Sequence, residues 1–284
     1  MYKRCVTRVS HSAIAIAIDS SISMQELTIL NNTPMPKMEA AALIANFIID
    51  ELIVRSTRAG IVLDYFDIAV LRYSGDGVES ILASEDDGLT NIKAINNIIP
   101  QPVCYNIQHK EKDGTEIVIP FTLHEWVTPK AHGIAPMYEA LVHIKELLSK
   151  WCDDSFNSNS FPPIVFNITD GCCSDADDME LMDVATEIRS LGTRDGSALL
   201  VNIYLANGGD NMESILFPSA TEHFSQDHDC QILYDMSSTL PMELEYMLKD
   251  ITGCINQRPY KCFARNSSIC EIVSLIDIGT DRGV

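Results

Sequence analysis

Three hydroxyls and a carboxylate directly follow an alternating apolar run near the start of the chain. The run covers residues 13–18, and Asp19, Ser20, Ser21 and Ser23 come after it. Carboxylate and hydroxyl oxygens are hard ligands, and Mg²⁺ takes about six oxygens, several of them from water. The pattern Asp-x-Ser-x-Ser therefore predicts a partial magnesium shell. The alternative is a simple loop cap, because Asp and Ser are common where strands end.

A second carboxylate stands in the same kind of position. Asp170 ends the apolar run of residues 164–169 and is followed by Gly171. In doubly wound sheets, ligands bind beyond the carboxyl ends of the strands, where the strand order reverses. If both strands lie at that point, Asp19 and Asp170 face one crevice. The alternative is that Asp170 and Gly171 form only a strand-ending turn.

The charge balance excludes some classes of partner. The chain of 284 residues has 40 acidic and 20 basic side chains, a formal charge of −20. This field repels nucleic acid and anionic membrane surfaces, and no cluster of Lys and Arg counters it. A divalent cation or a basic protein surface is the better partner. With 46% hydrophobic residues, the chain is expected to bury a full core.

Targeting and cysteine patterns point to a cytoplasmic protein. The apolar run near the N-terminus is shorter than the ~7–15 residues of a signal sequence, and no stretch approaches a membrane span of ~18 apolar residues. The nine cysteines show no paired zinc-ligand spacing, so reduced thiols are expected. The thiols of Cys172 and Cys173 lie beside the candidate site and are either reactive or inert.

Strand-like and helix-like segments alternate along the chain. This alternation predicts an α/β fold: a doubly wound, mostly parallel sheet with helices on both faces. For the helix over 174–192, Ser174 and Asp175 are the candidate caps. The expected strands cover 13–19, 66–74, 162–171, 197–207 and 230–236, and the expected helices cover 36–56, 136–151, 174–192 and 241–255.

The expected organisation is one domain over residues 1–255 and a C-terminal extension over 256–284. Residues 75–130 form an insertion of loops and short strands, with a hairpin turning at residues 112–114. The extension contains a strand-like run over 270–279 that the sequence does not place.

The order of these motifs resembles the von Willebrand factor type A (VWA) domain. An apolar strand, Asp-x-Ser-x-Ser, a Gly-Ile-Ala-Pro-Met stretch and a strand ending in Ile-Thr-Asp-Gly follow one another. The resemblance implies a Rossmann-like sheet with a metal-ion-dependent adhesion site at its top. Asp19, Ser21 and Ser23 match the first loop of that site, and Asp170 matches an aspartate that holds the metal through water. The implied ion is Mg²⁺, with Mn²⁺ or Ca²⁺ as substitutes.

One position departs from the family pattern. Where the family has a threonine before the Pro-Met of this stretch, the chain has Ala135. Alanine offers no oxygen, so the site is partly degenerate and a partner's carboxylate would contribute more. Alternatively, the site has decayed. His132 nearby is either a surface side chain or a substitute ligand.

The resemblance implies a bacterial-type, intracellular protein-binding module or scaffold, whose partner supplies an Asp or Glu to the metal. Some intracellular relatives, resembling tellurite-resistance VWA proteins, accompany kinases and phosphatases. One alternative is a metal-independent interaction protein that uses the insertion or the tail. A metal-assisted hydrolase is the other, but G-x-S-x-G, G-x-x-x-x-G-K and H-E-x-x-H motifs are missing. We therefore expect no enzymatic activity.

Overall fold

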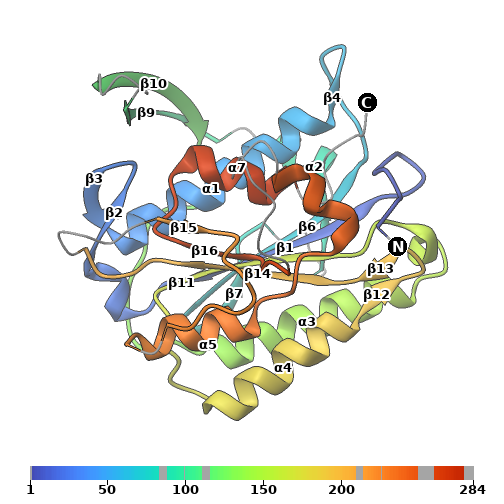
Figure 1. The fold of residues 1–284 in the computed structure, drawn as a ribbon. Coiled ribbons are helices and arrows are strands. Elements are labelled where there is room, and N and C mark those ends of the chain that lie inside the picture. Colours follow the sequence, from blue (N-terminus) through green and yellow to red (C-terminus); the bar gives the residue numbers. More distant parts are fainter. Residues whose placement is uncertain are drawn as a thin grey trace.

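The core of the computed structural model is a mostly parallel sheet (Figure 1). The structure describes residues 2–82, 88–98, 100–110, 116–208, 214–224, 226–248 and 259–277. Within these ranges the sheet has eight strands. Five are parallel: β1 (Ser12–Asp19), β6 (Phe66–Ser74), β11 (Ile164–Thr169), β14 (Leu199–Tyr204) and β16 (Phe263–Arg265). Three short antiparallel strands lie at its margins: β7 (Gly77–Ser80), β8 (Thr90–Asn91) and β15 (Ile215–Leu216).

The strand order reverses beside β1. From β1 the chain moves outward to β6 and β7, then returns to β11 on the other side of β1 and continues to β14 and β16. This order is that of a doubly wound sheet, and its switch point lies between β1 and β11. The predicted fold class is confirmed.

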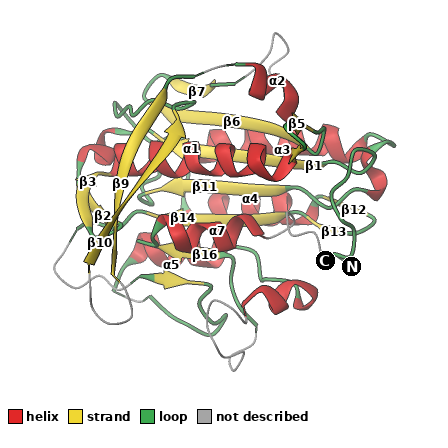
Figure 2. Ribbon diagram, turned by 90° about the horizontal axis from the view of Figure 1, so that it is seen from above, coloured by secondary structure: helices red, strands yellow, loops and turns green. Residues whose placement is uncertain are grey.

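Helices cover both faces of the sheet (Figures 1 and 2). One layer contains α1 (Lys37–Ser56), α2 (Ile92–Asn97) and α7 (Ile269–Asp277). The other contains α3 (Met137–Asp153), α4 (Asp178–Ser190) and α5 (His228–Met236). No helix in the described ranges is both long and apolar enough to cross a membrane.

The alternation of Ala and Ile in β1 divides the core in two. Ile14, Ile16 and Ile18 pack in the α1 layer, and the alanines between them pack in the α3 layer. The small side chain of Ala17 lies next to Asn167 of β11 in the strand register. Tyr73 of β6 donates its hydroxyl to Asn167 Oδ1 at 3.3 Å, which bridges β1 on this face. Alanine therefore leaves room for a buried polar link across the central strand.

Two segments predicted as strands are helices. Residues 230–236 lie in α5, where Cys230, Leu233 and Tyr234 are buried at helical spacing and Asp227 caps the N-terminus. The run over 270–279 begins in α7. In both cases the prediction was wrong because a short apolar run does not distinguish a strand from a helix by itself. Of the helix predicted over 241–255, the structure describes a 3-10 helix, η3 (Met242–Met247), and residues 249–258 lie outside the described ranges.

The segment predicted as a C-terminal extension supplies part of the main body. Its strand β16 pairs in parallel with β14, and α7 contacts α1. The sequence did not predict β16, because three residues are too few to show a period.

The caps predicted for α4 were also wrong. Its N-cap is Asp177, which accepts hydrogen bonds from Met179 N and Glu180 N in a capping box. Asp175 instead accepts from the backbone of Tyr138 and Glu139 at the start of α3. The loop that follows Asp170 thus caps both α3 and α4.

The insertion between β6 and α3 forms β7, β8, α2 and a hairpin. The hairpin strands are β9 (Pro102–Lys110) and β10 (Glu116–His124), and β10 contacts α1. The turn predicted at 112–114 lies outside the described residues. The described residues also form smaller paired or 3-10 elements: η1 (Ile22–Gln25), β2 (Leu27–Leu30), β3 (Thr33–Pro36), β4 (Thr57–Arg58), β5 (Ile61–Val62), η2 (Asn157–Asn159), β12 (Gly192–Thr193) and β13 (Gly196–Ser197).

Candidate functional site

The switch point brings the two predicted carboxylates together. Asp19 is the last residue of β1, and Asp170 follows the last residue of β11, its parallel neighbour. Thr169 Oγ1 donates a hydrogen bond of 2.8 Å to Asp19 Oδ2 and accepts one from Gly171 N at 3.0 Å. The sequence did not predict this threonine as a part of the site.

The Asp-x-Ser-x-Ser loop folds back over the end of β1. Asp19 and Ser21 are buried, and Ser21 N donates to Asp19 Oδ1 at 2.9 Å. The hydroxyls of Ser21 and Ser23 lie 3.0 Å apart. The main chain fixes the loop further, since Ile22 N donates to the carbonyl of Gly133 at 2.9 Å. The three predicted first-loop residues thus form one connected cluster.

Among the described residues, no Lys, Arg or His lies within ion-pair distance of the Asp19 carboxylate. Burial, and after it the negative charge of Asp170, raises its pKa to about 6, against the lowering effect of hydrogen bonds from Ser21 and Thr169. Desolvation disfavours the ionised form of a carboxyl group, and a second carboxylate adds repulsion. A cation close to Asp19 would therefore stabilise its ionised form.

Asp170 already has a cation beside it. Lys37, the first residue of α1, places its Nζ 3.0 Å from Asp170 Oδ2 and 3.1 Å from Glu26 Oε2. The side chains of Lys37 and Asp170 are both 4% exposed, whereas that of Glu26 is 57% exposed. The sequence did not single out Lys37. Its signal was a single lysine directly after Pro36, at the head of a helix that is otherwise rich in buried apolar residues.

Ala135 is buried in the loop that faces these residues. Its amide donates to Ser174 Oγ at 3.0 Å, and its carbonyl accepts from Ser174 N at 3.0 Å. The same loop donates a hydrogen bond from His132 N to the Ser20 carbonyl at 2.8 Å. The His132 imidazole is 57% exposed and lies 3.4 Å from Asp76 Oδ1, so its geometry is that of a surface side chain.

Close backbone contact fixes this loop. Gly133 has a φ of +68°, and a Cβ on Gly75 would lie 2.7 Å from its Cα. Both positions therefore require glycine.

The neighbouring thiols are poorly suited to react as thiolates. Burial raises the pKa of Cys173 to about 11, and its Sγ donates to Asp175 Oδ1 at 3.2 Å. Burial raises the pKa of the Cys172 thiol, and the negative charge of Asp170 is the second cause. Because the thiolate is the nucleophile, these shifts favour the inert of the two alternatives.

The donor set fits a hard divalent cation in part. The atoms gathered at the switch point are carboxylate and hydroxyl oxygens, which Mg²⁺ prefers. In the described ranges no group of three or more His, Cys, Asp and Glu residues is placed to hold a metal. A shell here would depend on Asp19, the hydroxyls of Ser21 and Ser23, and water. Asp170 would contribute only in competition with the ammonium of Lys37.

Apolar side chains are exposed on the two loops that build the site. Ile22, between the two serines, is 55% exposed, and Ile134, before Ala135, is 59% exposed. The hydrogen bond between Ile22 N and the Gly133 carbonyl holds the two loops against each other. The two loops of the site therefore each present one exposed apolar side chain.

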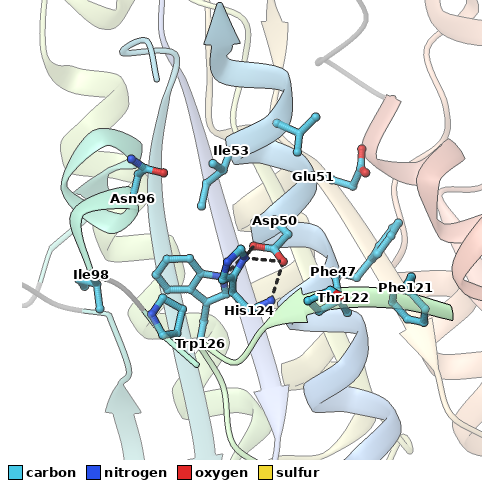
Figure 3. Close-up of a pocket in the computed structure, with 13 residues that line it drawn as sticks. Phe47, Asp50, Glu51, Ile53, Asn96, Ile98, Phe121, Thr122, His124 and Trp126 are labelled. Atoms are coloured by element: carbon cyan, nitrogen blue, oxygen red, sulfur yellow. Dashed lines mark hydrogen bonds and ion pairs between the residues drawn. The ribbon is translucent and has the colours of Figure 1, made fainter. Parts of the chain in front are cut away.

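A separate pocket of about 440 Å³ lies between α1, α2 and the β9–β10 hairpin (Figure 3). Asp50 faces His124 and Trp126 in this pocket, and it accepts hydrogen bonds from His124 N at 2.8 Å and from Trp126 Nε1 at 3.1 Å. His124 Nδ1 lies 3.1 Å from Asp50 Oδ1. These polar groups hold the hairpin on α1. The pocket is lined by Phe47, Asp50, Glu51, Ile53, Val54, Asn96, Ile98, Pro100, Phe121, Thr122, Leu123, His124 and Trp126.

Comparison with protein-family models and with curated proteins finds no match for this chain. Among solved structures, it is similar to one described as "Crystal structure of manganese-loaded Plasmodium vivax TRAP protein". The identity is 13%, the alignment covers 95% of this chain and 74% of that chain, and the TM-score is 0.47. A likeness at this level says nothing about what this chain binds.

Proposed function

We propose that this protein is a VWA-type protein-binding module whose partner contacts the edge of the sheet at the switch point. Asp19, Ser21 and Ser23 would hold Mg²⁺ directly and Asp170 through water, and an Asp or Glu of the partner would complete the shell. The observation that carries the proposal is the position of Asp19 and Asp170 at the ends of adjacent parallel strands, where doubly wound sheets bind ligands.

Two further features support a protein partner. Ile22 and Ile134 expose apolar surface on the loops of the same site, so a partner would bury them while it reached the metal. The formal charge of −20 favours a partner with basic residues around its carboxylate. When bound, the metal would supply positive charge between the carboxylates of this site and the carboxylate of the partner. The bacterial, cytoplasmic setting and a kinase or phosphatase system stay predictions.

A second candidate function is a metal-independent interaction protein. Two observations favour it: Ala135 has no ligand oxygen, and Lys37 compensates Asp170 without a metal. In that case the partner would bind the same face, or the insertion, equally well in a chelator. We assign no catalytic role, since the raised pKa values of Cys172 and Cys173 disfavour thiolate chemistry beside the site.

The test combines metal titration with peptide selection. Mg²⁺ and then Mn²⁺ are titrated calorimetrically into chelator-stripped wild type and Asp19→Ala. A displayed library of random 12-residue peptides is then selected on the wild-type protein in Mg²⁺. The proposal expects peptides that contain Asp or Glu, bind in Mg²⁺ and lose their binding in EDTA.

Matched variants decide between the two functions. Ile22→Ala is expected to weaken peptide binding without changing metal binding, because it removes apolar surface and adds no oxygen or charge. Ile61→Ala, at a position that is 63% exposed in β5, is the control for lost exposed apolar surface and is expected to change neither. Peptides that bind equally in EDTA and to Asp19→Ala would refute the metal-dependent function and favour the metal-independent one.

A further inference from the structure

The most unusual charge in the site is a lysine that is almost fully buried. The Lys37 side chain is 4% exposed, and its ion-pair partners are Asp170, equally buried, and the exposed Glu26. Removing an ammonium group from water costs several kcal/mol unless a close anion compensates. The pair of Lys37 and Asp170 is therefore a built-in part of the site and not a surface contact.

The fold holds this ammonium in place from two sides. The backbone of Lys37 donates to the Glu26 carbonyl at 2.9 Å, which ties the start of α1 to the end of η1 and thus to the Asp-x-Ser-x-Ser loop. Asp170 is held by its position after β11, and its second oxygen accepts from Cys172 N at 3.3 Å. Both oxygens of Asp170 are thus engaged within the chain.

The two carboxylates of the site are therefore not equivalent. Asp19 accepts from Ser21 N and Thr169 Oγ1, which are neutral donors, whereas Asp170 accepts from an ammonium. Within the described residues, Lys37 forms ion pairs with Asp170 and Glu26 and with neither oxygen of Asp19. The negative charge that remains uncompensated thus lies at Asp19.

We propose that Lys37 is the internal cation of this site and that it lowers metal affinity by competing with a divalent ion for Asp170. This inference rests on the proposed function, because it concerns the same site. A divalent ion bound at Asp19 would experience repulsion from the ammonium and would find Asp170 already paired. Recruitment of Asp170 to the metal would require it to leave Lys37, which would then remain paired with Glu26.

Because of this competition, the metal concentration decides whether Asp170 is paired with Lys37 or with the divalent ion. At low metal, the ion pair holds the loops without a divalent ion, so the fold of the site is retained. At higher metal, the divalent ion takes over Asp170. A ligand that binds only one of two states shifts their populations by its differential affinity, so Lys37 sets the concentration at which the site changes state.

The test is a double-mutant cycle on metal affinity. Mg²⁺ is titrated calorimetrically into wild type, Lys37→Met, Asp170→Asn and the double variant, and thermal unfolding is followed by circular dichroism in EDTA and in Mg²⁺. Lys130→Met is the charge-matched control, because Lys130 is 59% exposed and paired with Glu79. Asp19→Ala is made in the wild-type and Lys37→Met backgrounds.

The expected result is that Lys37→Met binds Mg²⁺ at least tenfold more tightly than wild type, whereas Lys130→Met changes little. In the Asp170→Asn background the gain should be smaller, because the competition for Asp170 is absent there and only the repulsion from the ammonium is relieved. If Lys37→Met does not fold in EDTA, the proposal expects Mg²⁺ to restore folding, since the metal replaces the missing charge. Failure of Mg²⁺ to restore it would refute the proposal.

The failure of this inference differs from the failure of the proposed function. If wild type binds Mg²⁺ in an Asp19-dependent way but Lys37→Met binds no more tightly, only the inference on Lys37 is refuted. If neither protein binds Mg²⁺, or if binding survives Asp19→Ala, the metal-dependent function and this inference both fail. Tightening by Lys130→Met equal to that by Lys37→Met would show a general charge effect and would also refute the inference.

Discussion

The side chains around Asp50 and those around Asp19 form two polar clusters, and the two carboxylates are compensated in different ways. Asp50 in the pocket accepts from a main-chain amide, an indole and an imidazole of the hairpin. Asp19 at the switch point accepts from one amide and one hydroxyl and lies close to a second carboxylate. The first cluster uses its donors to hold two elements together. The second retains uncompensated negative charge, which is the condition for binding a cation.

The largest effect is expected from breaking the buried ion pair. In EDTA, Lys37→Met should lower the free energy of unfolding by about 3–5 kcal/mol, because it leaves Asp170 buried without a compensating charge. The double variant with Asp170→Asn removes both charges and should recover most of this loss. Urea unfolding of the three proteins measures it. A loss below about 1 kcal/mol would mean that the pair is solvated in solution.

The next effect is a pH dependence that belongs to Asp19. Its pKa of about 6 lies above the ordinary 3.8, so the folded state holds the proton more tightly than the unfolded chain. In EDTA, the contribution of protonated Asp19 to the free energy of unfolding is complete below the ordinary pKa and is lost as the pH rises through about 6. The loss is on the order of 3 kcal/mol. Comparing urea unfolding of wild type and Asp19→Asn from pH 4 to 7 isolates it. Parallel curves for the two proteins would contradict the shift.

A smaller effect is expected in the pocket. Asp50→Asn should lower the free energy of unfolding by about 1.5–3 kcal/mol, because hydrogen bonds to a charged acceptor are lost. Amide exchange in the described parts of β9 and β10 should accelerate. The control is Glu51→Gln, which affects an i,i+4 pair with Arg55 at 3.3 Å and should cost no more than about 0.5 kcal/mol. Equal losses in the two variants would remove the contrast between the clusters.

The smallest effect concerns the missing ligand oxygen. Ala135→Thr should tighten Mg²⁺ binding a few-fold, which corresponds to about 1 kcal/mol or less. Ala135→Val has nearly the same shape without the hydroxyl, so any cost of crowding this buried position appears in both variants. Calorimetric titration separates them. If threonine and valine give the same affinity, position 135 does not contact the metal.

Much of the fold could be predicted, because its signals are local. The apolar runs that form β1, β6, β11 and β14 and the periodic segments that form α1 and α3 are each long enough to show their period. The predictions from short runs were wrong, as α5 and α7 show, since a helix and a strand of seven to nine residues bury similar sets of side chains. The predicted caps of α4 were wrong because Asp175 accepts a hydrogen bond from the start of α3 instead.

The sequence by itself determined which side chains end the strands and therefore that Asp19, Ser21, Ser23 and Asp170 lie at one edge of a doubly wound sheet. Periodicity and chain order suffice for this, because parallel strands end at the same edge. Only the tertiary structure decided how their charges are compensated. Lys37 and Asp170 are 133 residues apart, and their contact exists because α1 packs on the sheet beside β11. No local pattern encodes the partner of a buried charge, since that partner is chosen by the packing of distant elements.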